Sequence, residues 1–283
     1  MTSVLVLIAA PNSNAITQQV CERVGSEPKW LAMGDAAEFA DYPEGIHEQL
    51  SYYPIDVNIV PIANRRKKLL IADMDSTMID QECIDELGVM AGVGDHIKKI
   101  TARAMRGELD FEGALKERVA LLKGMDETII ADVISKRLTF KEGGHTLVAT
   151  MKRHGAYAAL VSGGFTAFTA HVATALDFDE NHANTLLVKN GKLSGEVAMP
   201  ILGKEAKVES LKRICKSLGI TQSDAIAVGD GANDIPMLLE AGMGVALHAK
   251  PMVQEQAPFV VNHGDLTALL YLQGHLKQEF VIQ

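Results

Sequence analysis

The chain has 283 residues, of which 47% are hydrophobic and 22% charged, so it can bury a substantial core and lacks the composition of a disordered protein. Its formal net charge of −9 argues against a broad basic surface for nucleic acid, so any bound anion needs local positive charge. No stretch reaches the roughly 20 apolar residues of a membrane span. Cys21, Cys83 and Cys215 are far apart and form no CxxC pattern, which argues against a disulfide framework or a cysteine zinc site. We therefore predict a cytoplasmic protein.

Residues 1–68 have the pattern of a small α/β unit. The apolar runs at 3–10 and 55–62 predict strands, and the stretch 12–25 predicts a helix capped by Asn12 or Ser13 and ended by Gly25. No cluster of titratable side chains stands out here. The sequence therefore predicts an accessory domain that carries no catalytic site.

From Leu69 onward, apolar runs that end in Gly, Asp or Ser turns alternate with helical stretches. Such runs suit strands buried on both faces of a parallel sheet, and the alternation predicts a doubly wound α/β fold. Ligands of such folds bind outside the carboxyl ends of the strands. The apolar runs and their turns occupy residues 69–75, 156–164, 225–234, 243–248 and 257–262.

The stretch between the first two runs, residues 83–140, has a helical pattern. We predict that it forms a cap over the strand ends, and that residues 69–82 and 141–283 form the core. Within the core, residues 186–197 predict a β-hairpin, because Asn190 and Gly191 are the residues that its tight turn favours.

Two acidic turns follow predicted strands. The motif DMDST places Asp73 and Asp75 two residues apart, and GDGAND contains Asp230 and Asp234. A divalent cation would relieve the repulsion between such carboxylates, and oxygen ligands suit Mg²⁺; the alternative is a strand end with solvated carboxylates. GDGAND lacks the third glycine of a dinucleotide fingerprint and the Gly-Lys-Ser/Thr of a P-loop. We predict that both turns share one metal site.

Two further features suit a phosphate. The turn VSGGF offers the Ser162 hydroxyl and the Gly163 backbone N–H as an anion cradle, although an ordinary glycine-rich turn would have the same residues. Lys207 begins a predicted helix, where it is either a surface lysine or the cation needed where the carboxylates meet a phosphate.

The order of DMDST, SGG, a helix-start lysine and GDGAND resembles the haloacid-dehalogenase-like hydrolase superfamily, over about residues 69–283. The resemblance implies a Rossmann-like core in which Asp73 attacks phosphorus and forms an aspartyl-phosphate, while Asp75 is the general acid and base. It also implies Mg²⁺ held by Asp73, Asp230 and the backbone carbonyl of Asp75. The helical insert resembles the caps of this superfamily.

The same resemblance implies further binding roles. Ser162, Gly163 and Lys207 would hold the phosphoryl oxygens, Asn233 would join the substrate-binding residues, and Asp234 would support the site.

The predicted cap contains one cation in an unexpected place. Arg118 lies within the apolar stripe of the helix that begins near Phe111, where a guanidinium is costly unless it reaches water or an anion. It could pair internally with Glu82 or Glu117, or it could hold a substrate carboxylate. Glu82 is an ordinary helix residue by default, but near the site it could hold an ammonium group. One cation and one anion beside a phosphoryl site describe a zwitterionic amino acid phosphate.

At this level the segments 73–88, 110–124, 161–165 and 229–238 resemble the phosphoserine phosphatases. The resemblance implies that Glu82 and Arg118 contact the serine amino and carboxylate groups and that Phe111 lines the pocket. The implied reaction is hydrolysis of O-phospho-L-serine to L-serine and phosphate, the last step of serine biosynthesis. The enzymatic alternatives are a phosphotransferase or a phosphatase of another small phosphomonoester. The non-enzymatic alternative is a receiver-like domain in which an aspartate only accepts a phosphoryl group. The segment 1–68 loosely resembles ACT-like regulatory extensions, and a homodimer stays open.

Overall fold

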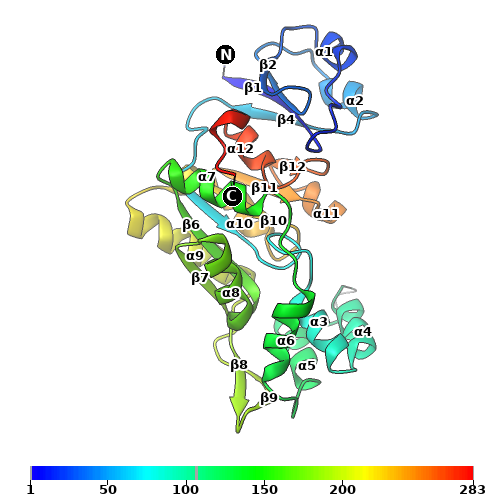
Figure 1. Ribbon diagram of the computed structural model, residues 1–283, viewed down its shortest axis with the longest axis vertical. Coiled ribbons are helices and arrows are strands. Elements are labelled where there is room, and N and C mark those ends of the chain that lie inside the picture. The colour runs from blue at the N-terminus through cyan, green and yellow to red at the C-terminus, as the bar shows by residue number, and fades with distance from the viewer. Residues whose placement is uncertain (1, 106–107, 283) are drawn as a thin grey trace.

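The computed structural model describes residues 2–105 and 108–282, and three β-sheets organise them (Figure 1). Residues 106 and 107, which fall inside the predicted cap, lie outside the described residues. None of the described helices combines the length and the apolar character needed to cross a membrane.

The largest sheet is parallel and has six strands in the order β12-β11-β10-β5-β6-β7. The predicted parallel α/β fold is therefore confirmed. Its strands are β5 (Leu69–Ala72), β6 (Tyr157–Phe165), β7 (Glu180–Asn184), β10 (Ala225–Gly229), β11 (Met243–Leu247) and β12 (Phe259–Val261).

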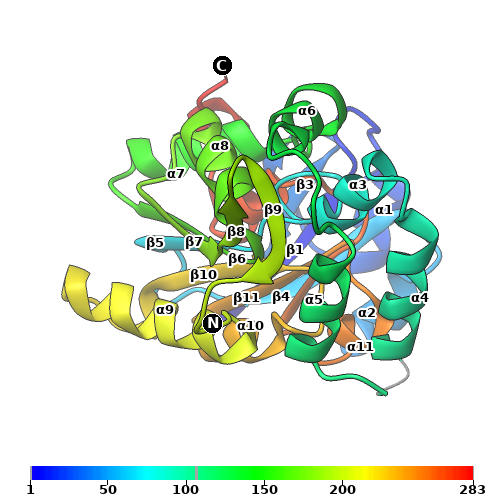
Figure 2. The same cartoon turned by 90° about the horizontal axis from the view of Figure 1, so that it is seen from below.

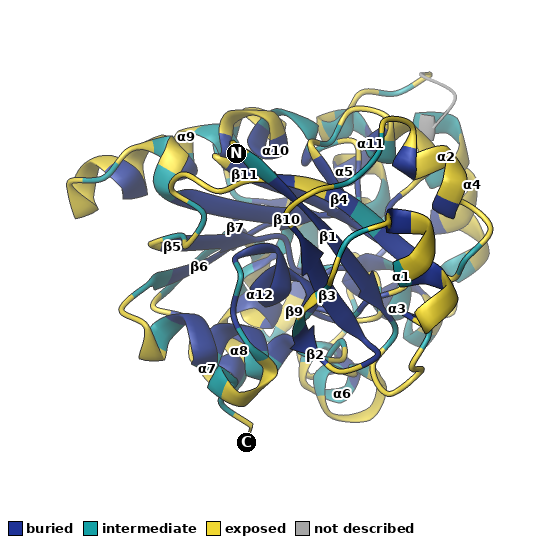
Figure 3. Cartoon of the chain, turned by 90° about the horizontal axis from the view of Figure 1, so that it is seen from above, coloured by how far each residue is buried: buried dark blue, intermediate teal, exposed yellow. Residues whose placement is uncertain are grey.

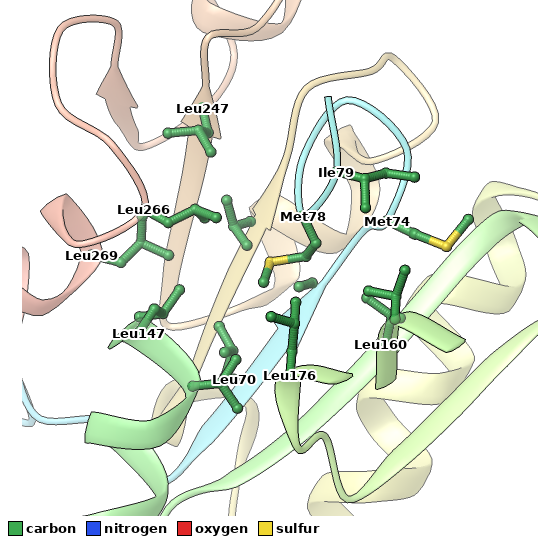
Figure 4. Close-up of a cluster of buried hydrophobic side chains, with 14 of the residues drawn as sticks. Leu70, Met74, Met78, Ile79, Leu147, Leu160, Leu176, Leu247, Leu266 and Leu269 are labelled. Carbon is green, nitrogen blue, oxygen red and sulfur yellow. The ribbon is translucent and has the colours of Figure 1, made fainter. Parts of the chain in front are cut away.

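Helices cover both faces of this sheet because successive strand residues point to opposite sides. Leu70 and its neighbours pack with α7, α8 and α12, as the cluster in Figure 4 shows, whereas Leu69 packs with α9, α10 and α11. These helices are α7 (Gly144–Arg153), α8 (Thr166–Leu176), α9 (Lys204–Leu218), α10 (Ile235–Glu240), α11 (Pro251–Gln254) and α12 (Ala268–Leu272); two short 3-10 turns are Gln222–Asp224 and Lys277–Glu279. Met74 is fully buried in the first cluster.

The described residues between β5 and α7 form four helices: α3 (Cys83–Met90), α4 (Gly94–Met105), α5 (Phe111–Ala120) and α6 (Thr128–Arg137). The predicted hairpin forms from β8 (Leu186–Lys189) and β9 (Lys192–Val197), with Asn190 and Gly191 both at positive φ in its turn. Figure 2 shows this hairpin beside α5. Backbone hydrogen bonds from Gly124 to Leu193 and from Glu127 to Gly191 tie the hairpin to the helical insert.

The N-terminal segment forms a separate antiparallel sheet in the order β2-β3-β1-β4. Its elements follow the ferredoxin-like sequence βαββαβ: β1 (Ser3–Ala9), α1 (Gln18–Val24), β2 (Lys29–Ala32), β3 (Ala36–Phe39), α2 (Ile46–Leu50) and β4 (Ile55–Pro61). The predicted helix start was wrong, because α1 is preceded by Thr17 and not by Asn12 or Ser13. The Asp35 carboxylate accepts the backbone N–H groups of Asn12 and Asn14 at 2.7 and 2.9 Å, which holds this stretch in a turn.

One face of the N-terminal sheet packs on the core. Val6 and Ile8 belong to the same buried cluster as Leu269 of α12, and Figure 3 shows the strands of both sheets as buried. The Asp56 carboxylate accepts the backbone N–H groups of residues 262–264 at 2.6–3.1 Å, and the Asn58 amide exchanges two hydrogen bonds with Val260. The N-terminal sheet therefore rests against β12 and α12, on the far side of the core from α3–α6 (Figure 1).

Candidate active site

The two acidic turns meet because β5 and β10 are neighbours in the parallel sheet. Ala72 is paired with Val228, and the Asp73 N–H donates to the Val228 carbonyl at 3.0 Å. One carboxylate oxygen from each of Asp73, Asp230 and Asp234 lies within 4.8 Å of the others. The carboxyl ends of two adjacent strands thus build an acidic cluster.

Lys207 lies in this cluster and not on the surface. It occupies the first turn of α9 and is 2% exposed, and its Nζ lies 2.7 Å from Asp73 Oδ1 and 2.5 Å from Asp234 Oδ1. Burial by itself lowers the pKa of Lys207, but the carboxylates of Asp234 and Asp73 outweigh it and raise that pKa. The Asp234 Oδ2 accepts the Gly231 N–H at 3.0 Å, so Asp234 is held on both sides.

The cluster keeps an excess of negative charge, since three carboxylates face one ammonium group. Burial, followed by the charge of Asp234, raises the pKa of Asp73 well above its ordinary range. Burial and then Asp234 and Glu82 raise the pKa of Asp230 to about 6. Asp73 Oδ1 is buried and accepts no well-directed hydrogen bond, despite its closeness to Lys207. Oxygen donors, excess negative charge and a buried orphan oxygen all fit a hard divalent cation.

Asp75 is held at the other side of the turn. Its Oδ1 accepts the Cys83 N–H at the start of α3 at 3.1 Å. Burial, and next the charge of Glu82, raise the pKa of Asp75 to about 7. A methyl group on Gly164 would lie 2.6 Å from Asp75 Oδ2, so a glycine is needed there for this close approach. A carboxyl group that binds its proton near neutral pH suits a proton donor.

The Ser162 turn differs from the prediction in one respect. Strand β6 continues through Phe165, with a register shift after Val161, and does not end at the glycines. Ser162 is buried, and its Oγ accepts the Gly164 N–H at 2.9 Å. A methyl group on Gly163 would lie 3.0 Å from Cζ of Phe111, so the Phe111 ring from α5 lies directly on this turn.

On the same helix, Glu117 pairs with Arg103 at 2.7 Å, and no ion pair joins the described side chains of Glu117 and Arg118. Arg118 is partly buried, and its Nε donates to the Ala114 carbonyl at 3.2 Å. Burial lowers the pKa of Arg118, and the negative charges of Asp85, Glu82 and Asp75 oppose that shift. The positive charge of Arg118 is therefore partly compensated by carboxylates at and beside the acidic site.

Glu82 lies between these groups. It precedes α3 and is exposed, and it accepts a hydrogen bond from the Ser76 hydroxyl at 2.9 Å. The Asn233 side chain is half-buried and lies against Gly231, where a methyl group would come within 2.4 Å of Asn233 Oδ1. The predicted site residues thus lie on the turns after β5 and β10, near the end of β6, at the starts of α9 and α10, just before α3, or on α5.

Sequence reasoning missed two residues. The Thr77 hydroxyl donates to Asp230 Oδ1 at 3.2 Å, and its place inside DMDST was a usable signal. Asp85 is the carboxylate with the largest effect on Arg118, and its position in the first turn of α3, three residues after Glu82, was a usable signal.

Comparison with known protein families assigns the chain to one of them. The sequence model of the haloacid dehalogenase-like hydrolases matches residues 70–239. The chain belongs to this hydrolase family.

Individual proteins with a similar sequence or structure include phosphoserine phosphatases and another HAD family hydrolase. A phosphoserine phosphatase of Haemophilus influenzae is 45% identical over 204 residues, which are 72% of this chain and 65% of that protein, so this hydrolase spans less than two thirds of that relative's length. A crystal structure of a HAD family hydrolase from Salmonella enterica serovar Typhi is 27% identical, with a TM-score of 0.85 over 98% of this chain and 99% of its own. A substrate-bound phosphoserine phosphatase complex is 42% identical, with a TM-score of 0.68 over 73% of this chain and 98% of its own.

Proposed function

We propose that this hydrolase cleaves O-phospho-L-serine to L-serine and phosphate. The observation that carries the proposal is the pair of opposite charges, Glu82 and Arg118, near the Asp75 carboxyl: burial and the charge of Glu82 raise the pKa of Asp75, and the charges of Glu82 and Asp75 both oppose the lowering of the pKa of Arg118 by burial. A zwitterionic leaving group offers one ammonium and one carboxylate to such a pair. The phosphoserine phosphatases that resemble the chain support the same substrate.

In the first step, Asp73 is the nucleophile. Its carboxylate attacks phosphorus, the bond between phosphorus and the serine oxygen breaks, and Asp75 gives its proton to that oxygen. The ester is cleaved without release of an alkoxide, and Asp73 now carries the phosphoryl group. Lys207, whose Nζ lies 2.7 Å from Asp73, and the turn of Ser162 and Gly163 would bind the phosphoryl oxygens.

In the second step, Asp75 acts as a base. It takes a proton from water, the resulting hydroxide oxygen bonds to phosphorus, and the bond between phosphorus and Asp73 breaks. Phosphate leaves, and both aspartates return to their starting states.

The proposal assigns Mg²⁺ to the acidic cluster. Asp73, Asp230 and the Asp75 backbone carbonyl would hold the ion, Asp234 would support the site through Lys207, and Asn233 would contribute to substrate binding. The ion would supply positive charge that offsets the repulsion between the carboxylates and the phosphate dianion.

Around this centre we propose that residues 83–140 are a cap that selects the leaving group, that residues 69–82 and 141–283 are the catalytic core, and that residues 1–68 are an accessory domain. The reaction would be the last step of serine biosynthesis. A cytoplasmic location and assembly into a homodimer are predictions from the sequence.

The function is tested by phosphate release with Mg²⁺ from O-phospho-L-serine, phosphothreonine, glycerol phosphate and a sugar phosphate. We expect a strong preference for phosphoserine in kcat/KM. Similar values for all four would instead favour a broad small-molecule phosphatase, and a phosphorylated acceptor formed in place of free phosphate would favour a phosphotransferase.

The Arg118→Ala variant tests the carboxylate contact. We expect kcat/KM for phosphoserine to fall by about 100-fold or more, because a charge-assisted bidentate contact is lost, while glycerol phosphate loses little. Arg103→Ala is the matched control, since Arg103 is a partly exposed arginine of α4 that pairs with Glu117. Equal losses on both substrates would refute the assignment of Arg118.

The raised pKa of Asp75, about 7, predicts a pH dependence. The proton donor is lost as the pH rises through this pKa, so phosphoserine turnover should fall on the alkaline side. The leaving group of 4-nitrophenyl phosphate needs no proton. The rate of the first step with this substrate should therefore stay constant over the same pH range. An alkaline limb that persists unchanged in Asp75→Asn would show that another group causes it.

A further inference from the structure

A second cluster of metal-ligating side chains lies at the opposite edge of the parallel sheet from Asp73. His154 follows the end of α7, just before β6 begins, whereas His275 and Glu279 lie in the C-terminal segment after α12. One ligand atom from each of these three residues lies within 4.8 Å of the others. The proposed hydrolysis uses none of them.

His275 is the central residue of this cluster. It is 2% exposed, and its Nδ1 is buried without a hydrogen-bond partner. Glu279 Oε1 lies 3.9 Å from this nitrogen, which is beyond hydrogen-bond distance. Burial first, and then the positive charges of Arg66 and His154, lower the pKa of His275 to about 4. The ring is therefore neutral at physiological pH, which is the form that binds metals.

The other two residues lie next to His275. The His154 ring is exposed, and its centroid lies 4.7 Å from that of His275 with the planes tilted by 57°. Glu279 is fixed by the Leu276 N–H, which donates to Oε2 at 2.7 Å. Arg66 donates to both Glu279 oxygens at 3.1 Å, so the carboxylate is held in its ionised form.

We propose that His154, His275 and Glu279 form a site for a transition-metal ion of the Zn²⁺ class, with solvent as the remaining ligand. Two imidazoles and one carboxylate suit Zn²⁺ and its neighbours, whereas Mg²⁺ prefers oxygen ligands alone. Zinc–ligand bonds are about 2.0–2.2 Å, so the ligand atoms must draw slightly closer together. The exposed His154 side chain is free to make that movement.

Binding would have a structural consequence. The ion would join the C-terminal segment to the end of α7, beside the stretch 62–68 that carries Arg66 and connects the N-terminal sheet to β5. Arg66 and Arg65 oppose a cation by their charge. The Arg66 side chain is 46% exposed and can turn toward solvent while one Glu279 oxygen binds the ion.

The test uses the full chain, stripped of metal and kept in excess Mg²⁺ so that the acidic cluster is occupied. Zn²⁺ is titrated in competition with a chromophoric chelator, on the wild type and on His154→Ala, Glu279→Gln and His47→Ala. His47 is an exposed histidine of α2, which packs in a hydrophobic cluster separate from that of α7 and α12, and its variant is the matched control. Thermal melts without Zn²⁺ check that each variant is folded.

We expect one Zn²⁺ per wild-type chain, with affinity at least about tenfold weaker in His154→Ala and Glu279→Gln and unchanged in His47→Ala. Co²⁺ in the wild type should give the intense visible absorption of a four-coordinate nitrogen and oxygen site, and His154→Ala should lose it. Failure of the wild type to bind Zn²⁺ under excess Mg²⁺ would overturn the proposal, and so would equal binding by all four proteins. These readouts do not depend on phosphatase activity.

Discussion

Replacing Asp73 by Asn is expected to lower phosphoserine turnover by on the order of 10⁴- to 10⁶-fold, the loss typical of a removed nucleophile. An amide at this position cannot form the acyl phosphate, while Lys207 and Asp234 still hold each other at 2.5 Å. Phosphate release is the measurement. The matched control is Asp80→Asn, an exposed aspartate in the same turn, which should keep nearly full activity. Wild-type-like release by Asp73→Asn would remove Asp73 as nucleophile.

The same variant also carries a stability prediction. The folded pKa of Asp73 lies above its unfolded value, so its contribution to stability is present at low pH and is lost as pH rises through the folded pKa. At neutral pH without Mg²⁺, the neutral amide should therefore leave the melting temperature unchanged or raise it. An inactive protein that is at least as stable as the wild type separates a catalytic role from a structural one.

Lys207→Met is expected to cost about 3–5 kcal/mol of unfolding free energy, in addition to most of the activity. The replacement fills similar volume but leaves the carboxylates of Asp73 and Asp234 buried without the ammonium group 2.7 and 2.5 Å away. Denaturant unfolding without metal measures the loss. Added Mg²⁺ should restore part of it, because a divalent cation can neutralise the same carboxylates.

Lys204→Met is the matched control for this prediction. Lys204 lies in the same first turn of α9, but its side chain is 60% exposed. Its Nζ lies 3.8 Å from Oε1 of the exposed Glu205, which is a long distance for an ion pair. Its replacement should change stability by no more than about 0.5 kcal/mol. If Lys207→Met were as stable as Lys204→Met, the Lys207 ammonium group would not stabilise the carboxylates of Asp73 and Asp234 as proposed.

The N-terminal sheet shows how a local pattern can miss a tertiary role. The apolar runs in 3–10 and 55–62 predicted strands, but these local patterns could not show that Val6 and Ile8 pack on α12. The polar residues of β4 were equally uninformative, because Asp56 and Asn58 find their partners about 200 residues away in the chain. The N-terminal sheet consequently shares a core with the parallel sheet through one of its faces.

The sequence by itself determined the parallel core and the meeting of its acidic turns. Apolar runs ending in DMDST, SGG and GDGAND are local patterns, and parallel strands bring their carboxyl ends to one edge whatever their order. It also identified Asp73, Asp75, Asp230, Lys207 and the residues of the helical insert as candidates.

Only the tertiary structure decided the features that depend on distant partners. It buried Lys207 between two carboxylates, gave Arg118 the Asp85 charge as its main counterpart, and placed the Phe111 ring on Gly163. It also joined His154 to His275 across 121 residues of sequence. These contacts join segments that are far apart in the sequence, and no local sequence pattern indicates them. The balance of charges and the geometry of ligand atoms therefore exist only once the chain has folded.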